Sequence, residues 1–140
     1  GPLTLTEEHG ALIRLDFGKK GQAGPETPLL AEARNQLEQY FSGTLRSFAL
    51  PLRPEGTPFQ QKVWAALQQI PWGETRTYGQ VAAMIGQPKA CRAVGMANNR
   101  NPLPIFIPCH RVIGANGQLT GYAGGLSAKE RLLALEQGGR

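Results

Sequence analysis

The segment TYGQVAAMIGQPKACRAVGMAN, residues 77–98, predicts how the second half of the chain folds. Thr77 and Gln80 have the spacing of a capping box, so a short helix is expected to begin here and to end near Gly86. Gln87-Pro88 then predicts the start of a second helix, which continues to the end of the segment. A short helix, a turn with glycine and a second helix resemble a helix-turn-helix unit, although ordinary domains also contain such pairs.

The second predicted helix has two different faces. At 100° per residue, one narrow apolar stripe is expected to be buried and consists of Ala90, Ala93, Val94 and Ala97. The opposite side carries Arg92, Gly95, Met96 and Asn99. A guanidinium beside a glycine, where another backbone can approach closely, fits a surface for nucleic acid. The alternative is an ordinary arginine in solvent.

A stronger helix signal precedes this segment. Thr57-Pro58-Phe59-Gln60 combines an N-cap residue, a proline at the first helical position and a capping-box glutamine. An apolar stripe follows at helical spacing, formed by Phe59, Val63, Leu67 and Ile70. Pro71 and Gly73 predict the end of this helix.

The beginning of the chain has the pattern of a small α+β unit. Apolar and polar residues alternate over residues 3–6 and 11–17, and Glu8-His9-Gly10 supplies a turn, so a β-hairpin is expected. Thr27-Pro28 predicts the start of a helix that ends at Gly43. Its apolar face is formed by Leu29, Ala33, Leu37 and Tyr40.

Residues 48–54 are interpreted as an extended linker broken by two prolines. We therefore expect a shortened N-terminal α/β subdomain over residues 1–53 and a second domain over residues 54–140. The length of 140 residues suits one compact domain, or a small subdomain beside a larger one.

The composition excludes several classes of protein. No apolar run approaches the ~20 residues that a membrane span needs, and no signal-peptide pattern opens the chain, so we expect no membrane partner. The only two cysteines, Cys91 and Cys109, exclude a disulfide scaffold and indicate a reducing compartment. Because no CxxC spacing occurs, we expect no metal site.

Charge is distributed unevenly along the chain. Between Glu74 and Glu130 the sequence holds six basic residues and no acidic residue, in a chain of net charge +5. This asymmetry indicates an anionic partner for the C-terminal part, and nucleic acid is the first candidate. A basic surface without any partner is the alternative.

Cys109 is the candidate nucleophile. The apolar run Leu103–Ile107 is interpreted as a short buried strand that ends at Pro108, so the thiol would follow a buried element. The adjacent His110 and Arg111 are cationic candidates that would lower the pKa of the thiol. An inert buried cysteine with a histidine beside it by chance is the alternative.

Glu136 is the candidate partner of the histidine. Ser127-Ala128-Lys129-Glu130 predicts a capping box and a last helix whose buried face is formed by Leu132, Leu133 and Leu135. Glu136 falls inside this apolar stripe and near the C-terminal end of the helix, where a carboxylate needs a compensating donor. His110 is the only histidine in this part of the chain, which favours a carboxylate–imidazole–thiol arrangement. The alternative is a frayed helix end with Glu136 in water.

Three motifs together resemble the O6-alkylguanine-DNA alkyltransferase family, also called methylated-DNA–protein-cysteine methyltransferases. They are Pro108-Cys109-His110-Arg111-Val112, Gly121-Tyr122-Ala123-Gly124-Gly125 and Gly56-Thr57-Pro58-Phe59-Gln60, and the resemblance extends from Gly56 to Glu136. It implies an α+β fold with a shortened RNase H-like N-terminal α/β subdomain and a mainly helical C-terminal domain that carries a helix-turn-helix.

The resemblance implies a role for each matched residue of the reaction. Cys109 would accept the alkyl group from O6 of guanine. His110 would act as a base through a bridging water, and Glu136 would orient it. Asn101 would link the recognition helix to the active-site turn. Tyr78 would rotate the 3′ phosphate and hydrogen-bond the base.

The resemblance also implies the contacts with DNA and the substrate pocket. Arg92 would enter the duplex and fill the space left by the flipped nucleotide, with its helix in the minor groove. The other expected DNA contacts are Tyr78, Gly95, Ala93, Asn99 and Lys89. The expected pocket residues are Val112, Tyr122, Ala123, Gly124 and Pro104. Ala123 stands where some relatives carry serine, which would widen the pocket for bulkier alkyl groups.

We therefore expect DNA repair by direct damage reversal, in which each molecule acts once. The partner would be double-stranded DNA with O6-methylguanine, O4-methylthymine being a second candidate substrate. The protein would be a monomer without cofactor, in the cytoplasm at the nucleoid of a bacterium or in the nucleus of a eukaryote. The alternatives are a non-catalytic protein that binds alkyl lesions and flags them, a cysteine hydrolase that uses Cys109, His110 and Glu136, and a DNA-binding regulator whose cysteine senses alkylation.

Overall fold

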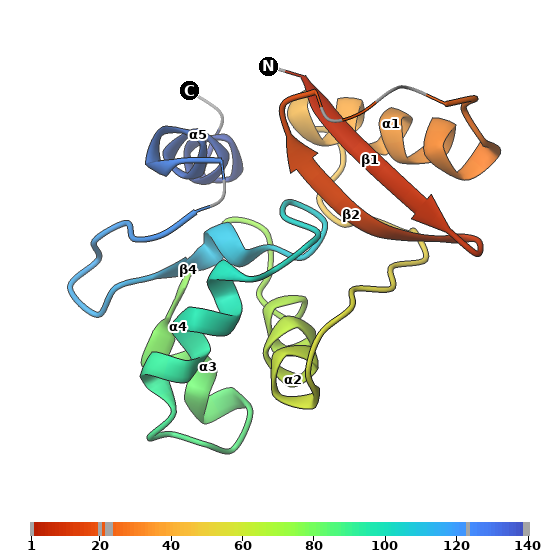
Figure 1. The fold of residues 1–140 in the computed structure, drawn as a ribbon. Helices are drawn as coiled ribbons and strands as arrows, with labels where there is room; N and C mark the ends of the chain where they lie inside the picture. The colour runs from red at the N-terminus through yellow and green to blue at the C-terminus, as the bar shows by residue number, and fades with distance from the viewer. Residues whose placement is uncertain (1, 20, 22–23, 123, 139–140) are drawn as a thin grey trace.

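The N-terminal part is a hairpin packed on one helix (Figure 1). We describe a computed structural model that covers residues 2–19, 21, 24–122 and 124–138. Strand β1 (Leu3–Glu8) pairs antiparallel with β2 (Ala11–Phe17), as the alternation predicted. The turn between them places His9 and Gly10 at positive φ, which glycine adopts without strain.

Helix α1 (Pro28–Phe41) covers the hairpin and begins as predicted. The Thr27 hydroxyl accepts a hydrogen bond from the backbone N–H of Leu30 at 3.1 Å, and Pro28 takes the first helical position. The following extended segment contacts the sheet edge, since Leu12 N–H donates to the Pro51 carbonyl at 2.9 Å. The predicted boundary between residues 53 and 54 stays a prediction.

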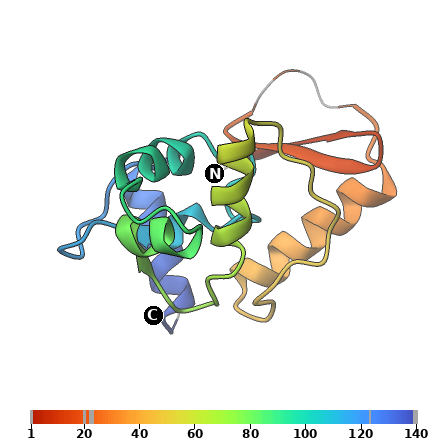
Figure 2. The same ribbon diagram turned by 90° about the horizontal axis from the view of Figure 1, so that it is seen from below.

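Two helices with complete capping boxes follow. Helix α2 (Pro58–Leu67) is capped by Thr57, and α3 (Tyr78–Met84) is capped by Thr77. In each box, the side-chain oxygen of a glutamine accepts a hydrogen bond from the backbone N–H of the threonine. Both starts agree with the sequence prediction. Seen from below, α2 lies between the hairpin–α1 unit and the pair formed by α3 and α4 (Figure 2).

Helix α4 (Cys91–Asn99) begins later than predicted, and only part of its predicted apolar stripe is buried. The predicted start at Gln87-Pro88 is wrong because the Ala90 N–H closes a turn on the Gln87 carbonyl at 2.9 Å. The predicted burial of Ala93 is also wrong. Val94 and Ala97 are buried as predicted, together with Asn98, whereas Ala93 lies about 100° around the helix from Val94 and is exposed.

The predicted strand over residues 103–107 is a buried turn instead. The Ile107 N–H donates to the Leu103 carbonyl at 2.9 Å, and Ile105 has a φ of 75°. Pro104 has no N–H to donate to a strand ladder, so local closure of the backbone replaces strand pairing. A small parallel sheet of β3 (Arg76–Thr77) and β4 (Val112–Ile113) lies nearby.

The last helix, α5 (Leu126–Glu136), lacks the predicted capping box. Gly125 takes the N-cap position, and no side chain caps the first turn. Ser127 already lies within the helix, where its hydroxyl cannot act as the N-cap.

One hydrophobic core joins the two halves. It includes Leu12 and Leu37 from the N-terminal part, together with Trp64, Leu67 and Ile107. The α+β class is therefore confirmed, with small sheets and mainly helical structure after residue 57. Over the part of the chain that the structure describes, no helix is both long and apolar enough to cross a bilayer.

Candidate active site

The candidate nucleophile lies in a buried turn. Cys109 begins the short 3₁₀ helix η1 (Cys109–Arg111), which leads into β4, and its side chain is sequestered from solvent. Burial raises the pKa of the thiol to about 11, although a hydrogen bond to Asn101 and the charge of Lys129 oppose the rise. The predicted lowering of this pKa by the neighbouring cations is therefore wrong. Arg111 turns to Glu136, and burial keeps His110 neutral.

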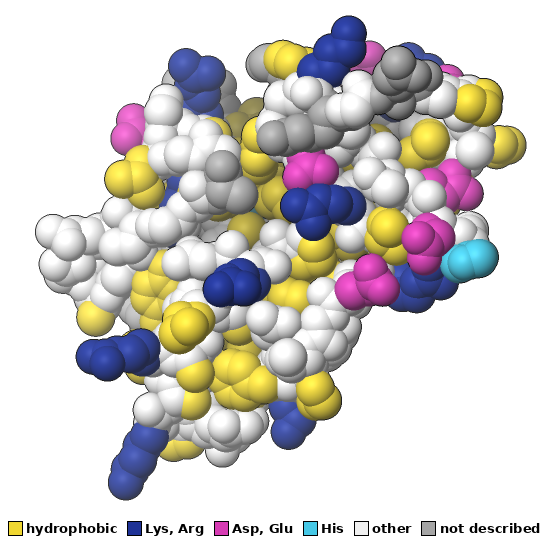
Figure 3. Space-filling view, in the orientation of Figure 1, with side chains coloured by type: hydrophobic (Ala, Val, Ile, Leu, Met, Phe, Trp, Pro, Cys, Tyr) yellow, Lys and Arg dark blue, Asp and Glu magenta, His cyan; other side chains and the backbone are white. Residues whose placement is uncertain are grey.

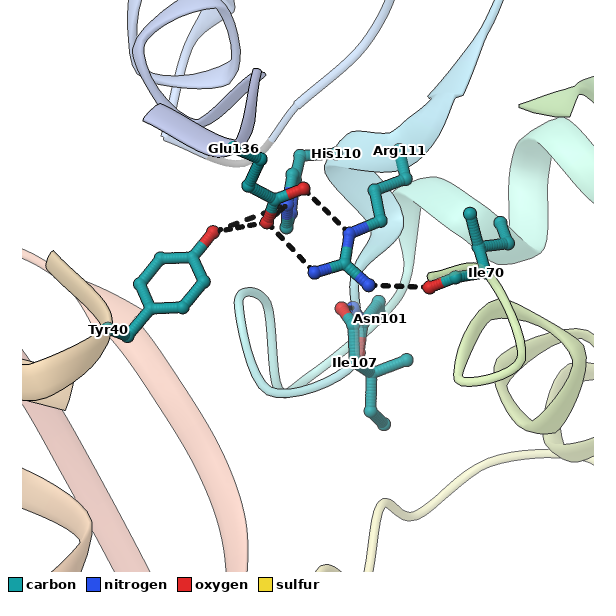
Figure 4. Close-up of polar contacts among 7 residues, drawn as sticks. All are labelled: Tyr40, Ile70, Asn101, Ile107, His110, Arg111 and Glu136. Atoms are coloured by element: carbon teal, nitrogen blue, oxygen red, sulfur yellow. Dashed lines mark hydrogen bonds and ion pairs between the residues drawn. The ribbon is translucent and has the colours of Figure 1, made fainter. Parts of the chain in front are cut away.

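Glu136 is the centre of a buried polar cluster (Figure 4). Arg111 donates from Nε to Oε1 at 2.8 Å and from Nη2 to Oε2 at 2.9 Å. The Oε2 atom also lies 2.7 Å from Nε2 of His110 and accepts a hydrogen bond from the Tyr40 hydroxyl at 2.5 Å. The predicted pairing of Glu136 with His110 is present.

These donors determine the charge of the carboxylate. Burial would raise the pKa of Glu136, but the hydrogen bonds from His110 and Arg111 outweigh it and hold the pKa at about 2. Glu136 is thus ionised at neutral pH although only 4% of its surface is exposed. A further hydrogen bond holds the guanidinium of Arg111 in place, because its Nη1 donates to the Ile70 carbonyl at 2.5 Å.

His110 is held in one tautomer by this contact. The side chain is completely buried, and burial lowers its pKa even though Glu136 favours the charged form. An ionised carboxylate can only accept, so the proton of the neutral ring sits on Nε2 and Nδ1 keeps its lone pair. Among the described residues, Nδ1 has no hydrogen-bond partner. It is therefore the nitrogen that can take up a proton.

Two asparagines fix the turn that carries the thiol. Asn101 donates from Nδ2 to the Ile107 carbonyl at 2.8 Å and accepts from the Leu103 N–H at 2.9 Å. Asn98, on α4, donates to the Cys109 carbonyl at 3.4 Å. This second asparagine was not among the predicted site residues. Both side chains connect the end of α4 to the backbone around Cys109.

Lys129 and Tyr40 are further residues that the sequence reasoning missed. Lys129 is fully buried and donates from Nζ to the carbonyls of Val112 and Thr120, both at 2.6 Å. The sequence did indicate that Lys129 is buried, because Lys129 lies one helical turn before Leu132 and Leu133 and on the same face as Glu136. Tyr40 was expected only as a core residue, and no local pattern identifies the distant partner of its hydroxyl.

The expected DNA-contact residues gather around α3 and α4. Tyr78 begins α3, its hydroxyl lies 2.6 Å from the Thr120 hydroxyl, and its ring faces Gly95, where an added Cβ would lie 3.7 Å away. Asn99 lies against Gly121, where a Cβ would meet its side-chain oxygen at 2.5 Å. The remaining members of the set are exposed, namely Lys89, Arg92 and Ala93. In Figure 3 this side shows basic side chains, whereas acidic ones lie mainly over the hairpin and α1.

Among the expected pocket residues, Tyr122 lies next to His110. The Tyr122 ring centre is 6.5 Å from that of His110 and 5.6 Å from that of Phe17. Gly124 also touches Phe17, since a Cβ there would lie 3.0 Å from the ring. Pro104 is buried in the turn of residues 103–107, and Val112 is buried directly after η1. Ala123 lies outside the described residues.

The fold and the site define a class of α+β proteins in which a helix-turn-helix unit supports a buried cysteine next to a histidine–glutamate pair. Comparison with known families is consistent with this class. The DNA-binding domain of 6-O-methylguanine DNA methyltransferase matches residues 58–138, and the ribonuclease-like domain of the same protein matches residues 1–54.

Known relatives agree with these matches. The chain is 56% identical to the methylated-DNA–protein-cysteine methyltransferase of Methanosarcina acetivorans, over 97% of this chain and 92% of the relative. It is 53% identical to the constitutive enzyme of Bacillus subtilis, over 89% and 81%. The chain therefore belongs to the methylated-DNA–protein-cysteine methyltransferase family, as the resemblance predicted, and this family defines its enzyme class.

Two solved structures place the fold in the same group. The Mycobacterium tuberculosis protein OGT, solved in complex with DNA, is 48% identical, with a TM-score of 0.90 over 98% of this chain and 87% of that one. The Schizosaccharomyces pombe protein Atl1, solved with damaged DNA containing O6-carboxymethylguanine, is 31% identical. Its TM-score is 0.52 over 59% of this chain and 78% of that one.

Proposed function

We propose that this protein repairs double-stranded DNA by moving an alkyl group from O6 of guanine to Sγ of its own Cys109. The observation that carries this proposal is the buried Cys109 turn beside a neutral histidine that is held by an ionised carboxylate. The product is a thioether, whose sulfur is a poor leaving group. Each molecule would therefore react once.

The proposed mechanism begins with removal of the thiol proton. With its pKa raised to about 11, Cys109 is protonated at rest, and Nδ1 of His110 takes the proton through a bridging water. Glu136 stabilises the imidazolium that forms. The thiolate attacks the alkyl carbon, the S–C bond forms, and the O6–C bond breaks. Guanine leaves with the electron pair of that bond and takes up the proton that the thiol gave to His110.

The proposal includes extrusion of the damaged nucleotide. The O6 atom of a stacked base cannot reach a buried thiol, and flipping a nucleotide out of the duplex costs a few kcal/mol. We propose that the exposed Arg92 on α4 occupies the space left in the duplex, which offsets part of this cost. Tyr78 would exchange its contact with Thr120 for the phosphate and base of the flipped nucleotide.

A mass measurement tests the alkyl transfer. The protein is incubated with duplex DNA that contains O6-methylguanine and weighed intact. We expect a gain of one methyl group, located on Cys109, and no gain in Cys109→Ala. A duplex with O4-methylthymine forms a second arm of the experiment. Unmodified protein that nevertheless binds the lesion tightly would overturn the proposal in favour of a non-catalytic lesion-binding protein.

A comparison of two substrates tests the role of Arg92. Arg92→Ala should slow the reaction with a duplex lesion by at least about tenfold, since the wedge offsets a cost of a few kcal/mol. It should leave the reaction with free O6-benzylguanine unchanged, because that substrate needs no extrusion. Lys62→Ala, which removes an exposed positive charge from α2, is the matched control. Equal losses on both substrates would contradict the role.

A further inference from the structure

We propose that Tyr40 is a positioning residue for alkyl transfer, which acts on His110 through Glu136. This inference rests on the function proposed above. The Tyr40 side chain comes from α1, at the opposite end of the sequence from Glu136, and is completely buried. Its hydroxyl donates to Oε2 of Glu136 at 2.5 Å and lies 3.5 Å from Nε2 of His110. Figure 4 shows it on the side of Glu136 opposite Arg111.

The contact involves the carboxylate oxygen that binds the imidazole. Oε2 accepts hydrogen bonds from His110, Arg111 and Tyr40. Among the described residues, Oε1 accepts one only from Nε of Arg111. A hydrogen bond from Tyr40 thus fixes the plane of the carboxylate from the side that the guanidinium does not reach. Since that plane aims the imidazole, the hydroxyl of Tyr40 sets the direction of Nδ1 as well.

Tyr40 is suited to donate and not to titrate. Burial raises its pKa strongly, and the charge of Glu136 raises it further, so the hydroxyl keeps its proton throughout the range in which the enzyme would work. Arg111 opposes this rise only in part. The hydroxyl is therefore a permanent donor to Glu136.

The surrounding rings fix the position of the hydroxyl. The Tyr40 ring centre lies 5.3 Å from those of Phe48 and Trp72 and 5.4 Å from that of Phe41. These contacts place the ring before any substrate binds. They also offer the competing explanation, in which Tyr40 is a core residue whose hydroxyl merely finds an acceptor. The experiment has to separate positioning from packing.

Loss of the hydroxyl should change the basicity of His110. Glu136 contacts Tyr40 from α1 and His110 and Arg111 from η1. The positive charge of Lys129 from α5 also acts on His110 and lowers its pKa. Without the donor from α1, the carboxylate attracts the His110 proton more strongly. The pKa of His110 then rises, and the imidazolium that cannot act as a base persists to higher pH.

The test compares Tyr40→Phe with Phe41→Leu. The single-turnover rate with free O6-benzylguanine is measured against pH, so that DNA binding plays no part. We expect Tyr40→Phe to react about tenfold more slowly, the range of a hydrogen bond to a charged group, with the acid limb of its profile at higher pH. Phe41→Leu changes a neighbouring ring without touching Glu136, and it should retain the wild-type rate and profile.

A double-mutant cycle identifies the route of the effect. If Tyr40 acts through the carboxylate, Tyr40→Phe should have little effect in a Glu136→Gln background. Equal effects in both backgrounds, or a wild-type rate and profile for Tyr40→Phe, would overturn the inference. The proposed function fails separately, when wild-type protein gains no alkyl group at all.

Should the variant not fold, a measurement on the wild-type protein tests the hydrogen bond on which the inference depends. The chain has three tyrosines, so ring-labelled protein gives few hydroxyl signals in a proton NMR spectrum. The Tyr40 hydroxyl proton should be visible and exchange slowly with water. Exchange as fast as that of an exposed tyrosine would overturn the inference.

Discussion

At the scale of single residues, the site rests on one buried charge with three neighbours. Glu136 is ionised because Arg111 and His110 supply donors at 2.7–2.9 Å, and Tyr40 adds a third. A carboxylate removed from water is stable only when its donors are complete, and removing one member of such a cluster costs about 3–5 kcal/mol. The same contacts that hold Glu136 ionised therefore couple stability to pH.

We expect acid to destabilise the protein in two steps. The pKa of His110 is lowered by burial from an ordinary 6.5, and that of Glu136 is lowered by its donors from 4.5 to about 2. Both groups bind protons more readily in the unfolded chain, so the stability that these two groups contribute is full above pH 6.5 and falls as the pH decreases. The His110 contribution starts to disappear below pH 6.5, and that of Glu136 between pH 4.5 and 2.

Urea unfolding at a series of pH values checks this expectation. In Glu136→Gln the loss of stability between pH 4.5 and 2 should be smaller than in the wild-type protein. A variant that loses as much stability as the wild type over that interval would contradict the assignment.

The two cysteines should differ sharply in reactivity. Cys91 is exposed at the start of α4, whereas Cys109 is buried with its pKa raised to about 11, so little Cys109 thiolate exists at neutral pH. Iodoacetamide at pH 8 should modify Cys91 first, as peptide mass spectrometry would show. Equal modification of Cys109 would mean that its thiol is already ionised and accessible at rest. Cys91→Ala removes the competing site.

Sequence reasoning found some of these residues and missed others for a physical reason. The position of Glu136 in an apolar stripe predicts a buried carboxylate that needs a donor, and His110 supplies one. The same argument, applied to Lys129, would have predicted a second buried charge. Tyr40 could not be identified, because its contact joins residues 96 positions apart and depends on how α1 packs against α5.

At the scale of elements, two identical caps permit a matched comparison. Thr57 and Thr77 each close a capping box, on α2 and α3 respectively. Replacing either by alanine should lower the free energy of unfolding by about 1 kcal/mol. Only Thr77→Ala should also slow the reaction with duplex DNA, because α3 begins with Tyr78.

Thermal unfolding and single-turnover rates distinguish the two variants. Reaction with free O6-benzylguanine should be nearly unchanged in both. A Thr57→Ala variant that lost as much duplex activity as Thr77→Ala would show that the loss follows stability and not the placement of Tyr78.

Elements were predictable where both partners of a local interaction lie within a few residues. The boxes at Thr57 and Thr77 are present because threonine and glutamine satisfy each other's backbone groups. The box at Ser127 is absent because the helix begins earlier, after Gly125. The turn at residues 103–107 was mistaken for a strand because burial gives both the same apolar composition.

At the scale of the whole molecule, the structure joins two parts of different charge. The stretch between Glu74 and Glu130 is free of acidic residues and forms β3, α3, α4, η1, β4 and the start of α5, while half of the ten acidic residues lie on the hairpin and α1. A shared core and the contact between Tyr40 and Glu136 connect the parts. The basic stretch would therefore bring anionic DNA to a site that the N-terminal part helps to build.

This separation of charge predicts how salt acts on the reaction. Binding of a basic surface to DNA releases counterions, so the rate with a subsaturating duplex lesion should fall steeply as the salt concentration rises. The rate with free O6-benzylguanine should hardly change, because that substrate carries no phosphate. Lys89→Ala, at an exposed position before α4, should reduce the slope of log affinity against log salt by about 1, as expected for loss of one phosphate contact. Lys62→Ala on α2 should leave the slope unchanged, and identical slopes for both variants would exclude Lys89 from the DNA surface.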